Sequence, residues 1–170
     1  MKKYIISISV IGVSALIILS ARATPQVGVT SVTLADGTLD EIDVFAKTDV
    51  NPGKPRDYWK TMLNTKGVSH VYIVSNSVAP GGTFGWHSHP GPTLVTVKSG
   101  TATEYEGKDQ TCTPHIHEAG TTFIDPGEET GHLVRNDGSV PLVVIACRIV
   151  PEGFPMRNDL PNPGYCPNLN

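Results

Sequence analysis

The histidines are the residues whose types and spacing most clearly indicate chemistry. Four of the six form two pairs whose members are two residues apart, His87 with His89 and His115 with His117. In a β-strand, residues two apart point to the same face, so two such imidazoles can chelate one metal ion. A glycine-rich stretch, residues 81–85, precedes the first pair and allows the backbone to turn sharply there. His87 and His89 are therefore two candidate ligands of a metal site, and the alternative is a pair of surface or hydrogen-bonded histidines.

A third ligand must come from a neighbouring strand, and His132 is the best candidate. It begins a short strand directly after the turn-rich stretch 125–131. The sequence thus predicts three imidazole ligands that come from two separate stretches of the chain.

The second pair, His115 and His117, has two possible roles. If the intervening Ile116 faces the core, both histidines face solvent. If they face the interior instead, they line a pocket or support a ligand histidine.

The elements that would position these residues are short strands separated by turns. Turn residues such as Gly, Pro, Asn and Asp recur between segments rich in β-branched and aromatic residues, and no βαβ alternation is present. This spacing predicts an all-β, antiparallel sandwich or barrel with few or no long helices. The expected strands cover residues 27–34, 39–46, 71–74, 83–89, 94–98, 101–106, 121–124, 132–135 and 142–150. We expect residues 57–63 to form a short helix or an irregular segment, and the tail after Pro151 to be extended.

The frame around the histidines resembles the two motifs of the cupin superfamily. Gly81, His87, His89, Thr93 and Gly100 follow the spacing of the first motif, and Gly120, Pro126, His132 and Asn136 follow that of the second. The resemblance covers about residues 71–150, and the chain is similar to the small single-domain, type-2-like cupins. This resemblance implies a jelly-roll β-barrel (a double-stranded β-helix) with one divalent metal inside. The strands that precede residue 71 are then expected to complete this barrel.

Two departures from the cupin pattern affect the site. Thr93 stands where the first motif usually has a Glu, and the second motif has one residue more than usual between Pro126 and His132. The extra residue falls near Glu128 and Glu129, either of which would replace the missing carboxylate or be exposed in a turn. Three neutral imidazoles leave a divalent ion its full charge and open positions. Thr93 would then hydrogen-bond a metal-bound water or be a plain strand residue.

The resemblance leaves the activity open among three alternatives. Imidazole ligands suit Fe(II), Mn, Zn or Cu as a group, and similar three-histidine cupins are often dioxygenases that act on small molecules. The second alternative is a non-catalytic module that binds a small ligand, and the third is a metal-dependent sugar isomerase. The sequence has no Lys or Arg cluster near the motifs that would hold a sugar phosphate. Cupins resembling this one often pair as homodimers through edge strands.

The N-terminus has the layout of a secretory signal peptide. Lys2 and Lys3 precede an uncharged run, residues 4–19, and an Ala21-Arg22-Ala23 cleavage pattern. We expect cleavage after Ala23 and a secreted or periplasmic protein; an uncleaved N-terminal anchor is the alternative. The remaining organisation is residues 24–66 as N-terminal strands that complete the barrel, 67–150 as the cupin barrel, and 151–170 as a Pro-rich tail.

Composition and charge exclude several classes of protein. The chain has 170 residues, too few for two large domains, and 39% are hydrophobic, enough for a packed core. Its formal net charge of −3 lacks the basic footprint of a nucleic-acid-binding protein.

The three cysteines permit one disulfide and one free thiol. Cys147 lies in a buried-strand sequence, whereas Cys112 and Cys166 lie in loop-like sequence. An oxidising compartment favours a disulfide, and we expect Cys112–Cys166; three free thiols are the alternative.

Overall fold

The computed structural model of the protein describes residues 22–51, 54, 58–127 and 130–166, and over these residues the regular structure is β-strand. The predicted signal peptide therefore falls largely outside the described residues. The strands are β1 (Val27–Leu39), β2 (Asp43–Asp49), β3 (Tyr58–Asn64), β4 (Ser69–Ser88), β5 (Thr93–Ser99), β6 (Thr101–Glu106), β7 (His115–Glu118), β8 (Thr122–Asp125), β9 (His132–Arg135), β10 (Leu142–Pro151) and β11 (Asn158–Asp159). Among the described residues, no helix is long and apolar enough to cross a membrane.

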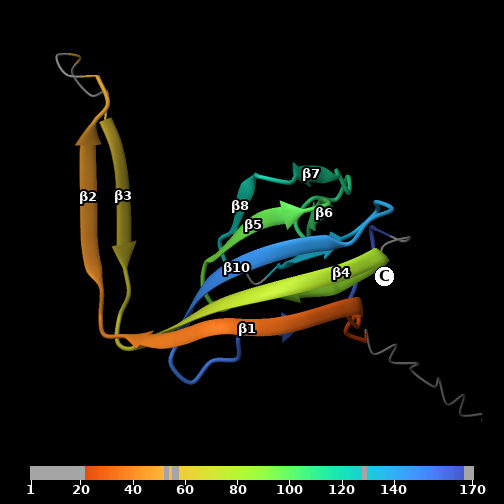
Figure 1. Cartoon of the computed structure of the whole chain (residues 1–170). Coiled ribbons are helices and arrows are strands. Elements are labelled where there is room, and N and C mark those ends of the chain that lie inside the picture. The colour runs from red at the N-terminus through yellow and green to blue at the C-terminus, as the bar shows by residue number, and fades with distance from the viewer. Residues whose placement is uncertain (1–21, 52–53, 55–57, 128–129, 167–170) are drawn as a thin grey trace, which may run out of the picture.

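One nine-stranded sheet carries most of the chain. Its order is β7-β6-β9-β4-β10-β5-β8, with β1 and β11 also paired to β4. Every pairing in it is antiparallel. The sheet curls into a nearly closed barrel (Figure 1). The predicted all-β jelly-roll architecture is confirmed.

Alternation along the strands puts apolar side chains inside the barrel. In β10, for example, Leu142, Val144 and Ala146 are buried, while the residues between them are partly exposed. Burial of such side chains contributes about 25 cal/mol per Å² of apolar surface removed from water. The interior cluster consists of Val78, Phe84, Val95, Val97, Ala102, Phe123, Val134, Leu142, Val144 and Ala146.

The long strand β4 joins two segments that the sequence predicts as separate strands. The expected turn at residues 79–82 is instead a bend within β4, where Gly81 has a φ of 75°. A second irregularity is a shift in the register of the pairing between β4 and β9, which falls between Thr83 and Trp86. At Gly85, between them, φ is 70° and a Cβ atom would lie 2.4 Å from the carbonyl oxygen of Thr24. Only glycine fits there, and this bend directs the end of β4 into the mouth of the barrel.

The N-terminal region departs from expectation in two ways. Residues 57–63 were expected to be helical or irregular, but Tyr58–Asn64 is strand β3, because its residues pair with β2 over its whole length. The prediction that all strands before residue 66 complete the barrel is also wrong. Only β1 joins the barrel sheet, whereas β2 and β3 form a separate two-stranded hairpin that projects from it (Figure 1).

The Pro-rich tail closes over the end of β4. Within it, β11 pairs with Ser88 and His87, and Leu160 donates its backbone N–H to the carbonyl of Trp86 at 2.9 Å. A disulfide joins Cys112 to Cys166, and Cys147 is a free thiol. Cys166 packs with Trp86 and Leu133 in a second apolar cluster. The disulfide therefore fixes the tail against the strands that carry the histidines.

Candidate metal centre

Strand register brings the first and third histidines together. His87 on β4 and His132 on β9 are directly opposed partners in an antiparallel pair. Such partners project their side chains to the same face at close range, and the Nε2 atoms of the two rings lie 3.2 Å apart. Both side chains are buried, with 3% and 7% of their surface exposed.

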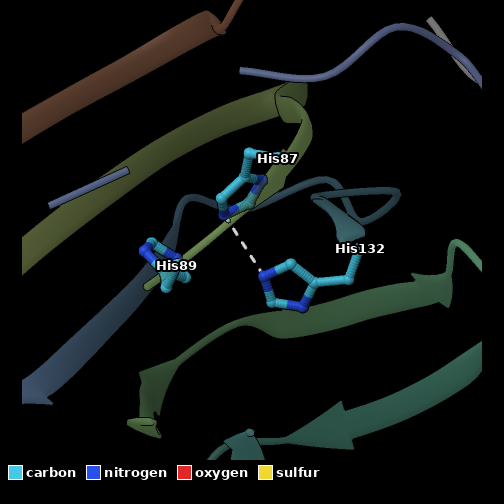
Figure 2. Close-up of side chains that lie close together, drawn as sticks. All are labelled: His87, His89 and His132. Atoms are coloured by element: carbon cyan, nitrogen blue, oxygen red, sulfur yellow. Dashed lines mark hydrogen bonds between the residues drawn. The ribbon is translucent and has the colours of Figure 1, made fainter. Parts of the chain in front are cut away.

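His89 lies directly after β4 and completes a group of three. It shares the inward face with His87, as residues two apart do in an extended chain, while Trp86 points the other way into the second apolar cluster. Figure 2 shows the three rings turned toward one another. One ring nitrogen from each lies within 4.8 Å of the other two. The structure thus brings together the three residues that the sequence predicts as ligands.

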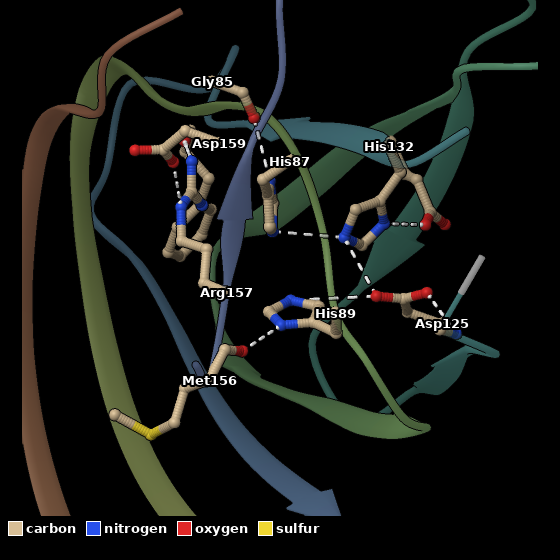
Figure 3. Close-up of polar contacts among 11 residues, drawn as sticks. Gly85, His87, His89, Asp125, His132, Met156, Arg157 and Asp159 are labelled. Carbon is tan, nitrogen blue, oxygen red and sulfur yellow. Dashed lines mark hydrogen bonds and ion pairs between the residues drawn. The ribbon is translucent and has the colours of Figure 1, made fainter. Parts of the chain in front are cut away.

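The other nitrogen of each ring contacts a group that can only accept a hydrogen bond. The Nδ1 atom of His87 donates to the carbonyl of Gly85 at 2.9 Å, and that of His89 donates to the carbonyl of Met156 at 2.6 Å (Figure 3). The Nδ1 atom of His132 donates to the carboxylate of Glu104 at 2.7 Å. These contacts place the ring proton on Nδ1, so that Nε2 carries the free lone pair.

Three lone pairs directed at one point repel one another unless a donor or a cation lies among them: a proton on one ring, a water molecule that donates to two of them, or a metal ion that all three share. Ligand atoms about 2.1 Å from an ion lie about 3.0 Å apart at a right angle and about 3.4 Å apart at the tetrahedral angle. The 3.2 Å between the Nε2 atoms of His87 and His132 lies in this range. The donor set and its spacing therefore fit a divalent metal ion.

Burial keeps two of these rings neutral. Burial, followed by electrostatic interactions with His132 and Arg157, holds the pKa of His87 well below its ordinary value. For His89, burial and then the charge of Arg148 lower the pKa to about 3. Neutral imidazole is the form that binds a metal.

Glu104 on β6 is a supporting residue that the sequence analysis missed. Its carboxylate accepts hydrogen bonds from both His132 and His117, the latter at 2.8 Å. Burial alone would raise the pKa of Glu104, but the hydrogen bonds from these two histidines outweigh it and lower the pKa. Glu104 is therefore the anionic partner that orients His132.

The second histidine pair splits between the two roles considered for it. Ile116 is 57% exposed, so it does not face the core, and His117 points inward, where it stacks on Phe123 with ring centroids 4.1 Å apart. His117 thus reaches His132 through Glu104. His115 is exposed and lies outside the pocket, because it stands on the edge strand of the sheet. The possible role of His115 as a pocket residue is therefore corrected.

Asp125 also faces the histidines, and the sequence analysis missed it. Its Oδ2 atom lies 3.4 Å from Nε2 of His132 and 3.7 Å from Nε2 of His89 (Figure 3). A signal was present, because alternation in β8 puts Asp125 on the same buried face as Phe123. The carbonyl of Met156 had no such signal, because it depends on where the tail docks. Glu128 and Glu129, the carboxylates considered in the sequence, lie outside the described residues.

A small pocket adjoins the three histidines, with a cavity volume of about 30 Å³. Its walls are largely apolar, and its polar side chains include Thr93 and the half-buried Arg148. Thr93 is 1% exposed, and among the described residues its hydroxyl has no hydrogen-bond partner. The pocket is lined by Asn76, Phe84, His87, His89, Thr93, Val95, Phe123, His132, Val134, Val144, Ala146 and Arg148.

Comparison with known families decides which family this fold and site belong to. The family model described as the cupin domain matches residues 76–147, a span that contains all three histidines. That stretch of the chain is a cupin domain. Comparison with curated proteins gives no match.

Solved cupin structures resemble the chain in fold. A cupin-2 domain protein from Rhodospirillum rubrum is 14% identical with a TM-score of 0.50, and the match covers 81% of this chain and 68% of that one. A cupin superfamily protein from Desulfitobacterium hafniense is 16% identical with a TM-score of 0.44, and the match covers 78% and 84%. At such identities, the likeness to the Rhodospirillum protein shows the fold alone.

We expect the metal-free cupin to lose stability as the pH falls below about 6.5, because His87 and His89 stay neutral when folded but take up protons when unfolded. The contribution of the two histidines to the free energy of unfolding is fully present above their pKa in the unfolded chain, and it is lost as the pH falls below that value. The slope is at most about 1.4 kcal/mol per pH unit for each histidine. Urea unfolding in chelator between about pH 7.5 and pH 5 measures it. The His87→Asn/His89→Asn variant should flatten the slope and exposed His115→Asn should keep it; equal slopes in all three proteins would contradict the assignment.

Proposed function

We propose that this cupin binds one divalent metal ion through His87, His89 and His132, and that it oxidises a small anionic molecule with dioxygen in the adjoining pocket. The observation that carries the proposal is the convergence of three buried Nε2 atoms whose rings are all held in the metal-binding tautomer. When bound, a divalent ion there supplies Lewis acidity and positions for a substrate oxygen and for dioxygen.

The pocket supports a small, negatively charged substrate. Arg148 supplies a positive charge in an otherwise apolar wall, and the hydroxyl of Thr93 is free to donate a hydrogen bond. Phe84, Val95 and Phe123 line the same space and exclude water, which strengthens the charge interaction. A carboxylate or enolate of few atoms matches this lining.

The same lining argues against the sugar isomerase. Arg148 is the only cationic residue among the pocket's lining side chains, whereas a phosphate generally needs more than one charged or hydrogen-bonding donor. The oxygen-uptake experiment described below distinguishes a non-catalytic binding module from an enzyme. Imidazole ligands suit Fe(II), Mn, Zn or Cu, and Fe(II) is one of these ions that reacts with dioxygen.

Metal content and oxygen uptake test the proposal. We expect about one divalent ion per chain in the wild type, background metal in His87→Ala/His89→Ala, and unchanged metal in His115→Ala. The Fe(II)-reconstituted wild type should consume oxygen with at least one of a panel of small carboxylates, diketones, thiols and flavonols. Equal metal in all three proteins would reject the site. Bound metal without oxygen uptake for any metal and substrate would reject the enzyme in favour of the binding module.

We further propose that the protein is exported, with cleavage after Ala23. The disulfide between Cys112 and Cys166 supports export, because such bonds persist in oxidising compartments and are rare in the cytosol. Fractionation of bacterial cells that express the full chain, followed by N-terminal sequencing, should place a chain that begins at Thr24 in the periplasm or medium. Recovery of the uncleaved chain in the membrane or cytosol would contradict this.

We also propose that the protein is a homodimer in which the second copy covers the β2–β3 hairpin. A lone two-stranded hairpin is marginal in water, and this one exposes 60% of Phe45 and 72% of its cross-strand partner Met62. Phe45→Ser/Met62→Ser should shift the mass measured by light scattering toward the monomer. Ile116→Ser, which removes a similarly exposed side chain on β7, should not. A monomeric wild type would contradict the proposal.

A further inference from the structure

The carboxylate of Asp125 is buried without a partner for one of its oxygens. Asp125 is 6% exposed. Its Oδ1 atom accepts the backbone N–H of Gly127 at 2.9 Å, whereas among the described residues its Oδ2 atom has no hydrogen-bond partner. A buried carboxylate oxygen without a hydrogen-bond donor is costly, and Arg148, whose charge acts on Asp125 electrostatically, does not supply that donor.

Two of the three proposed ligands lie close to Oδ2. Nε2 of His132 lies 3.4 Å away and Nε2 of His89 lies 3.7 Å away. Both rings carry their proton on Nδ1, where Glu104 and Met156 accept it. Their Nε2 lone pairs therefore face the lone pairs of Oδ2, and a metal ion between them would make the contact favourable. Figure 3 shows Oδ2 on the side where these rings converge.

The position of Asp125 in the sheet explains how a carboxylate from β8 can reach the three histidines. Asp125 on β8 is the direct cross-strand partner of Thr93 on β5, and Thr93 holds the position where the first cupin motif usually has a Glu. Directly opposed residues project to the same face. A carboxylate on β8 therefore enters the barrel one strand away from the usual position.

We propose that Asp125 is the fourth protein ligand of the metal ion and replaces the carboxylate that is absent at Thr93. This inference rests on the proposed metal site. A carboxylate ligand lowers the net charge of a divalent site from +2 to +1 and adds a hard oxygen donor. Such a set favours Mn(II) and Fe(II) relative to three imidazoles alone.

The test uses Asp125→Asn, which keeps the shape and the acceptor for Gly127 but removes the charge. We expect the affinity for Mn²⁺, measured by calorimetry, to fall by about 100-fold or more, beyond the usual effect of an outer-shell residue. Asp137→Asn, which alters an exposed aspartate paired with Arg135, should bind Mn²⁺ as the wild type does. Asp125→Asn/Thr93→Glu, which restores a carboxylate at the opposite position, should recover most of the loss.

A second measurement separates a ligand from a merely structural aspartate. In chelator, Asp125→Asn should melt at the same temperature as the wild type or higher, because it removes an unpaired buried charge. Added Mn²⁺ should raise its melting temperature less than it raises that of the wild type.

The outcomes distinguish the two proposals. Undiminished Mn²⁺ affinity in Asp125→Asn, together with loss of binding in His87→Ala/His89→Ala, would overturn the role of Asp125 and leave the metal site standing. A clear drop in the melting temperature of metal-free Asp125→Asn would also count against a ligand. A wild type that binds no divalent metal would overturn both proposals.

Discussion

The site depends on the hydrogen bonds made by the outer nitrogen of each histidine ring. Gly85, Met156 and Glu104 each offer only an acceptor to Nδ1. With the ring protons held there, three lone pairs point at one buried spot, and the contact between Nε2 of His87 and Nε2 of His132 needs a proton or a metal ion between the two atoms. The barrel therefore stores an unfavourable arrangement that a cation relieves. Stability given up at a site for the sake of binding is a common exchange in proteins.

The apolar core of the barrel stabilises the fold that holds these histidines in place. Apolar side chains such as Val78, Val97 and Leu142, each no more than 1% exposed, fill the barrel beside the polar end. Their burial supplies the stabilisation that the buried polar groups do not. The bend at Gly85 then directs the last residues of β4 inward, and the disulfide fixes the tail that carries the acceptor for His89.

The sequence predicts the parts of this structure that depend on local pattern. Residues two apart place His87 and His89 on one face, and motif spacing finds His132, because strand alternation and turn chemistry are local properties. Glu104 and Met156 escape such reasoning, because their roles depend on register and on the docking of the tail. The strand β3 was missed because its partner β2, and not its own composition, decides its conformation. Long-range pairing is therefore what the pattern of a single sequence leaves undetermined.

The order in which the chain is made gives the contact between His89 and Met156 a further consequence. The two residues are 67 positions apart, so the acceptor leaves the ribosome well after His89. During synthesis, the first two histidines emerge well before the residues that set their ring protons. The three rings are thus oriented together only after the segment that carries Met156 has been made and has docked.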